Sequence, residues 1–333
     1  MRLGLFAVLL VASVSPVLVS AQSIDGSIGN VNPFSISLTP QYPSSSSVVT
    51  MSFVSSSIDL TNTTMTVTVK GSQIYQGNVQ PVAVMVGKAG SITPIVVTMT
   101  NAGVRYSQSV SLQPQDVSLV AEPLASAPPL YPGKPLVPLE GNTRIVAVAN
   151  IADATGRTID PTTLSYTWTV DGAEISNSSG IGKAAVIVTS PFQYRLRTVS
   201  VLVQSQVGNL AGKASLTLSP KESSVRLYEN DPLLGIRFGR ALLGTFTIRG
   251  AEASIYAAPF SVPLAGGVPV IQWFLNGAKA QTGNLITLRP TGNGQGNATL
   301  SLTASGPANT FATASTNLSL IFGAKPSSNF FGL

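Results

Sequence analysis

The sequence predicts an all-β protein of three tandem antiparallel β-sandwiches preceded by an N-terminal signal peptide. Short runs of alternating apolar and polar residues recur along the chain, separated by turn residues at intervals of about 8 to 12 residues, which is the pattern of half-buried strands. One group of landmarks occurs three times. After residue 22, no segment has the apolar period of an amphipathic helix.

The first 21 residues are typical of a secretory signal peptide. Arg2 supplies a positive charge, the run Leu3–Val19 is almost entirely apolar, and the small residues Val19-Ser20-Ala21 predict cleavage before Gln22. Polar residues and a proline interrupt the run, so a retained membrane anchor is the weaker alternative. No later run approaches the roughly 18 to 20 apolar residues that a transmembrane helix requires. We therefore expect an exported chain, at the cell surface, in a periplasm or outside the cell, with no transmembrane segment in its mature form.

The composition excludes several kinds of active site. The chain has no Cys and no His, which removes thiol nucleophiles, disulfides, Cys/His zinc sites and every triad with an imidazole base.

Only 10% of residues are charged, and the net charge of +6 is thinly spread. The densest basic cluster is diluted by acidic residues, so we interpret it as solvated surface and expect no nucleic-acid partner. Its members are Arg226, Arg237, Arg240 and Arg249, with Glu229 and Asp231 among them. Export without Cys fits a bacterial envelope protein better than an animal secreted one.

One landmark of the repeat is a strand that ends in a tight turn containing glycine. The segment Trp168–Gly172 reads Trp-Thr-Val-Asp-Gly, and Trp273–Gly277 reads Trp-Phe-Leu-Asn-Gly, 105 residues later. A fainter copy, Val67–Gly71, lies 101 residues before the first of these. An Asp-Gly or Asn-Gly pair between alternating runs is a strong hairpin signal, because type I′ turns need positive φ at both central residues. The residues to which we assign a structural role are Trp168, Asp171, Gly172, Trp273, Asn276, Gly277, Val67 and Gly71.

The repeat sets the expected domain boundaries. Pro114 and Pro220 predict short, stiff joints, because proline fixes φ and restricts the residue before it. Such joints favour a rod of stacked domains. The expected boundaries are 1–21 for the signal peptide, 30–114, 115–220 and 221–323 for the sandwiches, and 324–333 for a flexible tail.

Two further segments have more than one interpretation. Residues 123–138 contain six prolines, which predicts an edge strand or a loop of the second sandwich. The tail ends in Phe330-Phe331-Gly332-Leu333, which is either an unattached end or a peg that docks on a partner.

A unit of about 100 residues with about seven short strands has the size of an immunoglobulin-like sandwich, in which the third strand often carries a core Trp. We therefore predict that Trp168 and Trp273 are buried core anchors, and the alternative is a platform for stacking on sugars. The segments Tyr166–Gly172 and Ile271–Gly277 resemble the W-x-[VLF]-[DN]-G core of PKD-type and related immunoglobulin-like domains of bacterial surface proteins. The resemblance covers the second and third units well and the first by its strand pattern alone. The resemblance implies that these units act as spacers, stalks or binding modules, and it supplies no catalytic residues.

Other patterns that could carry chemistry have simpler interpretations. Several acidic residues lie at predicted strand ends or turns, so we assign them turn and cap roles rather than the paired carboxylates of a glycosidase. The stretch Glu229–Asp231 is a weak candidate for calcium. Gly180–Lys183 lacks the spacing of a phosphate-binding loop, and Ala184 replaces its Ser or Thr. We expect no enzyme activity, no metal and no cofactor. The acidic residues to which we assign turn and cap roles are Asp153, Asp160, Asp171 and Glu174.

These observations predict an exported, non-enzymatic envelope or cell-surface protein whose modules act as a spacer, an adhesive or an assembly component. The expected partners are protein or glycan components of the cell envelope, among them pilus or surface-layer subunits. Binding would use the loops at the ends of a sandwich or an exposed sheet edge that accepts a partner strand. The alternative is a secreted carbohydrate-binding or carbohydrate-active protein with Trp or Tyr side chains stacked on a glycan.

Overall fold

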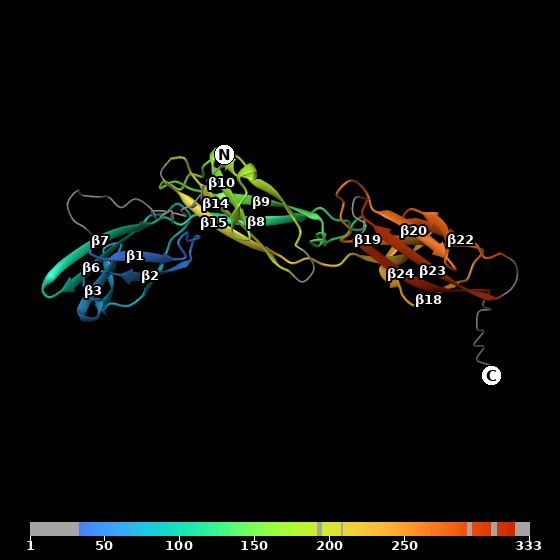
Figure 1. Ribbon diagram of the computed structural model, residues 1–333, viewed down its shortest axis with the longest axis horizontal. Coiled ribbons are helices and arrows are strands. Elements are labelled where there is room, and N and C mark those ends of the chain that lie inside the picture. Colours follow the sequence, from blue (N-terminus) through green and yellow to red (C-terminus); the bar gives the residue numbers. More distant parts are fainter. Residues whose placement is uncertain (1–32, 192–194, 208, 292–294, 308–311, 324–333) are drawn as a thin grey trace, which may run out of the picture. The chain divides into compact units, whose positions relative to one another are not determined.

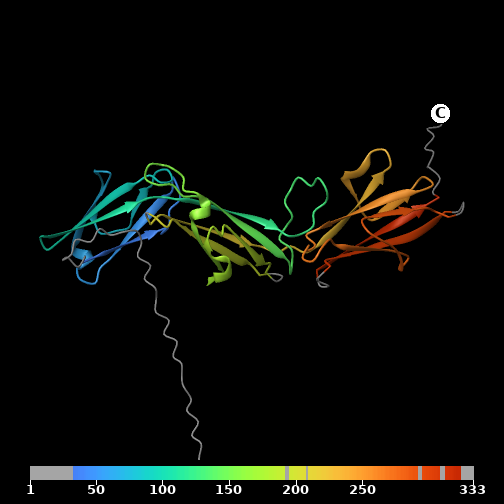
Figure 2. The same cartoon turned by 90° about the horizontal axis from the view of Figure 1, so that it is seen from above.

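The computed structural model describes residues 33–191, 195–207, 209–291, 295–307 and 312–323 (Figures 1 and 2). The predicted signal peptide and the tail with Phe330-Phe331 lie outside these residues. Strands dominate the described chain, and its helical parts are three short 3-10 turns. The prediction of tandem immunoglobulin-like β-sandwiches is confirmed. No helix among the described residues is long and apolar enough to cross a membrane.

The chain divides after Pro114 into two compact units, residues 1–114 and 115–333. The first unit holds one hydrophobic core, and the second holds two separate cores, so the described chain has three sandwiches.

The first sandwich packs a three-stranded sheet, in the order β1-β2-β5, against a four-stranded sheet, in the order β4-β3-β6-β7. All of its strand pairs are antiparallel. Alternate residues face the core, as in β6, where Ile95, Val97 and Met99 are fully buried. The elements are β1 (Ser35–Thr39), β2 (Val48–Val54), η1 (Leu60–Asn62), β3 (Thr63–Val69), β4 (Ser72–Asn78), β5 (Val82–Met85), β6 (Thr93–Asn101) and β7 (Val104–Leu112).

The second sandwich repeats this arrangement. The sheet β13-β9-β8 faces the sheet β11-β10-β14-β15, and β12 also pairs with β10. The buried Gln115 side chain satisfies both backbone groups of Ala152, donating to its carbonyl oxygen at 2.9 Å and accepting from its N–H at 2.7 Å. The elements are β8 (Asp116–Pro123), β9 (Asn142–Asn150), η2 (Pro161–Thr163), β10 (Ser165–Val170), β11 (Ala173–Glu174), η3 (Ser176–Ser178), β12 (Gly180–Ile181), β13 (Ala185–Thr189), β14 (Arg197–Gln204) and β15 (Ala211–Leu218).

The third sandwich contains two strands that the others lack. Its sheets are β17-β16-β19-β22 and β18-β24-β23-β20-β21. The extra strand β17 returns along β16 as a hairpin, and the chain then crosses to the other sheet, where β18 pairs with β24 in the parallel direction. This pair departs from the otherwise antiparallel order that the sequence predicts. The elements are β16 (Ser224–Asp231), β17 (Gly235–Leu242), β18 (Thr245–Ile248), β19 (Ala253–Phe260), β20 (Val270–Leu275), β21 (Ala278–Thr282), β22 (Leu285–Leu288), β23 (Gly296–Ser305) and β24 (Thr313–Phe322).

The tight turn that marks the repeat has the same backbone geometry in each sandwich. The turn pairs Lys70-Gly71, Asp171-Gly172 and Asn276-Gly277 have φ near +50° at the first residue and near +83° at the second. Both angles are positive, as a type I′ hairpin requires. The pair Ala102-Gly103, between β6 and β7, has the same geometry.

The first turn residue also bonds to the neighbouring strand. The backbone N–H groups of Lys70, Asp171 and Asn276 donate to the carbonyl oxygens of Pro94, Thr198 and Thr299, respectively. In the second and third sandwiches, the Asp171 and Asn276 side-chain Oδ1 atoms accept the N–H of that threonine, at 2.9 and 2.8 Å. The first sandwich has Lys at the turn, which offers no acceptor, and Pro94 on the strand, which has no N–H to satisfy. The two differences therefore compensate each other.

This compensation predicts unequal effects of alanine at equivalent turns. Asp171→Ala leaves the Thr198 N–H without its acceptor and removes the Arg197 ion pair, so we expect the free energy of unfolding to fall by about 1 kcal/mol. Lys70→Ala removes no such bond and is the matched control. Asp171→Asn keeps the acceptor and should retain most of the stability. Urea unfolding curves of the three variants test this expectation, and equal effects of Asp171→Ala and Lys70→Ala would contradict it.

The proline-rich segment after β8 connects the second and third sandwiches. The Ser126 backbone donates its N–H to the Val262 carbonyl (2.8 Å) and accepts the Ser261 N–H (2.9 Å), and its Oγ accepts the Val262 N–H (3.1 Å). Leu264 donates to the Leu124 carbonyl at 3.0 Å. Ser126, Ser261 and Val262 are all buried. We call residues 124–126 and 261–264 the clamp.

A second contact joins the same two sandwiches. The Lys221 N–H donates to the Val137 carbonyl at 2.8 Å, and the rings of Tyr131 and Phe260 meet edge to face at 5.5 Å. The segment predicted as an edge strand or loop of the second sandwich therefore also holds the third.

Candidate binding groove in the first sandwich

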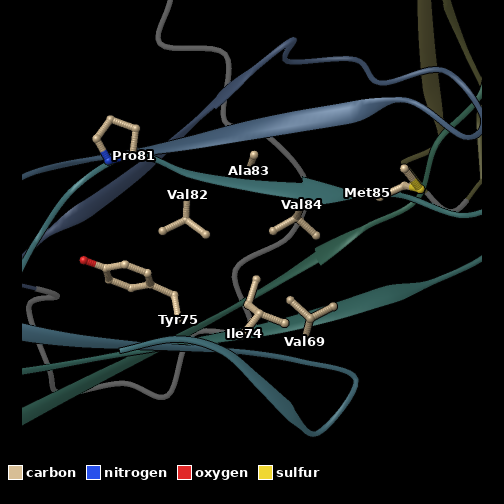
Figure 3. Close-up of a pocket in the computed structure, with 8 residues that line it drawn as sticks. All are labelled: Val69, Ile74, Tyr75, Pro81, Val82, Ala83, Val84 and Met85. Atoms are coloured by element: carbon tan, nitrogen blue, oxygen red, sulfur yellow. The ribbon is translucent and has the colours of Figure 1, made fainter. Parts of the chain in front are cut away.

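A groove opens in the first sandwich between edge strands of its two sheets. β4 is the outer strand of one sheet and β5 the outer strand of the other. Figure 3 shows Val69, Ile74 and Tyr75 on one side, facing the β5 segment on the other. The groove has a volume of about 420 Å³, and none of the eight described residues that line it is charged. They are Val69, Ile74, Tyr75, Pro81, Val82, Ala83, Val84 and Met85.

Strand alternation explains how β5 serves both the core and the groove. Val82 and Val84 point inward and are buried, whereas Ala83 and Met85 are exposed, Met85 to 70%. On β4, Ile74 is 48% exposed. The rim of the groove thus carries two large apolar side chains in contact with solvent.

The backbone of β5 has an unpaired edge beside the groove. Among the described strands β5 pairs with β2 alone. The pairing with the chain next to β2 continues past the end of β5. The Val86 N–H donates to the Ser47 carbonyl oxygen at 3.0 Å, and the Ser46 N–H donates to the Gly87 carbonyl oxygen at 2.8 Å. The opposite edge, from Val82 to Gly87, is available to another strand.

Tyr75 forms one wall of the groove and is held by its own strand. Its hydroxyl donates to the Asn78 carbonyl at 2.5 Å. Gly77 makes this possible, because a Cβ at that position would lie 2.9 Å from the Tyr75 hydroxyl oxygen. The ring is therefore placed by a short-range contact that any larger residue at 77 would disturb.

The corresponding connection between sheets is fixed by a tryptophan in the other two sandwiches. The Trp168 indole Nε1 donates to the Lys183 carbonyl at 2.9 Å, and the Trp273 Nε1 donates to the Gly283 carbonyl at 2.7 Å. Both acceptors lie in the segment that crosses from one sheet to the other just before β13 and β22. The equivalent residue of the first sandwich is Val67, which is buried but has no donor to tie the crossing segment.

The structure places every residue to which the sequence assigned a structural role. Trp168, Trp273 and Val67 have no exposed surface, and the other five residues form the three tight turns. With both indoles in the core, neither Trp offers a face to a sugar. Sequence reasoning did not identify the groove. Among its lining residues, only Val69 belongs to a repeat motif, and that motif indicates a hairpin, so no sequence signal pointed to a groove.

The carboxylates act in turns, as the sequence predicts for Asp153 and Asp160. Hydrogen bonds from Thr155 and from the Arg157 and Thr155 N–H groups lower the pKa of Asp153, and bonds from Thr162 lower that of Asp160. Asp231 has a lowered pKa because the Leu234 and Leu233 N–H groups donate to it. No group of three or more acidic residues among the described positions could hold a metal ion.

An aromatic cluster covers the outer face of one sheet in the third sandwich. Phe238 of β17 meets Tyr228 of β16 at 5.2 Å and Tyr256 of β19 at 6.0 Å, with interplanar angles of 66° and 87°. These are edge-to-face contacts, so the three rings pack on one another and do not form a coplanar platform. Burial raises the pKa of the Tyr256 hydroxyl. This geometry suits local packing better than stacking on a glycan.

A comparison with protein-family models and one with curated proteins each found no match to the chain. Solved structures with some likeness are multidomain proteins. Sidekick-1 immunoglobulin domains 1–5 match at 12% identity and a TM-score of 0.32, over 84% of this chain and 56% of that one. The three N-terminal domains of the bacteriophage RB49 outer capsid protein Hoc match at 11% identity and a TM-score of 0.25, over 88% and 100%.

A further match is the SGBP-B protein of the Bacteroides ovatus mixed-linkage glucan utilization locus, solved with a mixed-linkage heptasaccharide. It has 13% identity and a TM-score of 0.20, over 95% of this chain and 76% of that one. This chain spans little more than half of the Sidekick-1 fragment. At these TM-scores the likenesses carry no argument about function.

Proposed function

We propose that the chain is an exported, non-enzymatic envelope or cell-surface protein whose sandwiches space and present a binding groove for a protein partner. The observation that carries this proposal is the apolar groove beside the unpaired edge of β5. An extended peptide that adds to such an edge gains main-chain hydrogen bonds, while pockets for its alternate side chains supply specificity. The groove offers both features.

The chemistry of the groove defines the partner it suits. Its lining is apolar, and Ile74 and Met85 stand exposed at the rim. A strand added along β5 with apolar side chains on both faces would cover Ile74 on the groove side and Met85 on the outer side, and would remove their surface from water. Protein components of the envelope, including pilus or surface-layer subunits, remain the expected class.

The domain organisation is part of this proposal. We assign the sandwiches to residues 30–114, 115–220 and 221–323, and the signal peptide to residues 1–21. The second and third sandwiches are proposed to be PKD-type domains, supported by their Trp-x-x-Asp/Asn-Gly hairpins.

Cell fractionation tests the proposal. We expect the tagged chain in the envelope fraction, together with a co-purifying envelope protein. The double substitution Ile74→Asp/Met85→Asp should abolish that association, because it places two charges on the apolar rim. Val104→Asp is the matched control, since Val104 is 50% exposed on β7, at the opposite edge of the sheet that contains β4.

The outcomes separate the proposal from its rival. Loss of the partner with the groove variant and its retention with Val104→Asp would support a groove function. Recovery of the chain as a free monomer in the medium, with binding to polysaccharide that the groove variant does not affect, would establish the carbohydrate-binding alternative instead.

A further inference from the structure

We infer that the groove of the first sandwich binds the segment Asn329–Leu333 of a second copy of this chain, so that copies join head to tail. This inference rests on the proposed function, because it names an occupant for the same groove. It also gives a role to the Phe330-Phe331 motif.

The segment and the groove match in chemistry. Residues 326–333 read Pro-Ser-Ser-Asn-Phe-Phe-Gly-Leu and contain no charged side chain. The groove lining is equally free of charge. A strand without charged side chains brings no side-chain ion into such a site, whereas a charged side chain would pay the cost of desolvation.

The segment also has the alternation that the site requires. In an extended strand, Phe331 and Leu333 point to one side and Phe330 points to the other. A strand added along β5 would direct Phe331 and Leu333 into the groove, between Val84 on one wall and Ile74 on the other. Phe330 would then lie on the outer face near Met85, which is 70% exposed without such a cover.

The third sandwich places the start of the tether far from the clamp. The clamp lies at the end of this sandwich where β20 begins. Val270, the first residue of β20, pairs with Ser305, and Ser305 pairs with Thr313, the first residue of β24. β24 therefore begins at the same end as the clamp. β24 then runs ten residues, about 30 Å, to Phe322 at the opposite end.

The tether between Phe322 and the binding segment is short. Residues 323–328 span at most about 20 Å when extended, which is less than the length of β24. The segment therefore does not reach back past its own sandwich to the clamp, and the acceptor inferred for it is the first sandwich of another molecule. Because the donor and acceptor surfaces differ, the contact is heterologous and continues from copy to copy.

A peptide titration tests the contact directly. The probe is a labelled peptide of residues 324–333, added to a chain truncated after residue 323, with fluorescence anisotropy as the readout. We expect saturable binding that weakens by about tenfold or more for a Phe331→Asp peptide, as for an anchor residue of an interface. The Ile74→Asp/Met85→Asp protein should bind as weakly, and Val104→Asp should bind like the unaltered groove. Absence of binding, or equal binding by the groove variant, would overturn the inference.

A mixing experiment tests the head-to-tail geometry. The intact chain should form a concentration-dependent series of oligomers in analytical ultracentrifugation, while the truncated chain and the groove variant should each be monomeric. A mixture of these two should stop at a dimer, since one has only the groove and the other has only the segment. Oligomers of the truncated chain alone would contradict the inference.

The two proposals fail in different ways. If the peptide does not bind but the groove variant loses its envelope partner in cells, the occupant is wrong and the groove function stands. If the peptide binds but the groove variant still associates with the envelope, the self-contact stands and the groove is not the envelope-binding site.

Discussion

Replacing Trp168 with Ala is expected to lower the free energy of unfolding of the second sandwich by about 3 to 5 kcal/mol. The side chain has no exposed surface and lies in a core with Tyr166, Val199 and Val201. Its removal leaves a cavity and also frees the Lys183 carbonyl, which loses the indole donor at 2.9 Å. A loss of this size is a large part of the stability of a typical domain.

Two further variants separate the contributions. Trp168→Phe fills much of the space but cannot donate, so we expect a loss smaller than that of Ala. Trp168→Val introduces the residue that the first sandwich has at this place, and we still expect marked destabilisation because the neighbouring core residues are shaped around an indole. Ile187→Ala, at a 60% exposed position in the same sandwich, is the control. Urea unfolding followed by circular dichroism gives the values, and an effect of Trp168→Ala no larger than that of the control would contradict the assignment.

Disrupting the clamp is expected to divide one unfolding transition into two. Ser126→Pro removes the N–H that binds the Val262 carbonyl and the Oγ that accepts the Val262 N–H, in a buried setting. Polar groups left unsatisfied there cost about 1 to 3 kcal/mol each. Without this contact, the second and third sandwiches should unfold independently.

The protein contains a convenient reporter for this experiment. The only two tryptophans are Trp168 in the second sandwich and Trp273 in the third, so fluorescence of the chain follows these two sandwiches and not the first. The parent chain should show one fluorescence transition, and the clamp variant should show two that no longer coincide. Leu136→Pro is a suitable control, because Leu136 is 53% exposed in the same proline-rich segment and does not have a positive φ that proline could not adopt. Coincident transitions in the Ser126 variant would contradict a coupling role for the clamp.

Local sequence signals were sufficient for the strands and the turns. Asp-Gly and Asn-Gly are among the few residue pairs that tolerate positive φ at both positions. The turns at Asp171-Gly172 and Asn276-Gly277 could therefore be predicted from these residues alone. Alternation within β6 or β14 likewise reports which side chains face a core. The all-β class follows from these features without reference to any distant contact.

The remaining features depend on which distant segments meet. Ser126 is one polar residue in a proline-rich stretch, and nothing near it in the sequence indicates that it binds Val262, 136 residues later. β18 is short and its parallel partner β24 is about 70 residues away. The groove lies between β4 and β5, the outer strands of two different sheets, which come together only in the folded sandwich. Val67 was visible in the sequence, but the structure was needed to show that Trp at this position in the other two sandwiches bonds to the segment that crosses between the sheets.

The direction of β24 has a consequence for a molecule that bears load. The chain enters the third sandwich at Ser224, near the clamp, and leaves β24 at the opposite end. Tension between these points pulls β16 and β24, which lie in different sheets, lengthwise in opposite directions. The hydrogen bonds of β16 to β19 and of β24 to β23 are then loaded in shear rather than opened one after another. The four parallel pairs between β18 and β24 add to the bonds that must break at the same moment. The third sandwich is therefore built to transmit force along its strands.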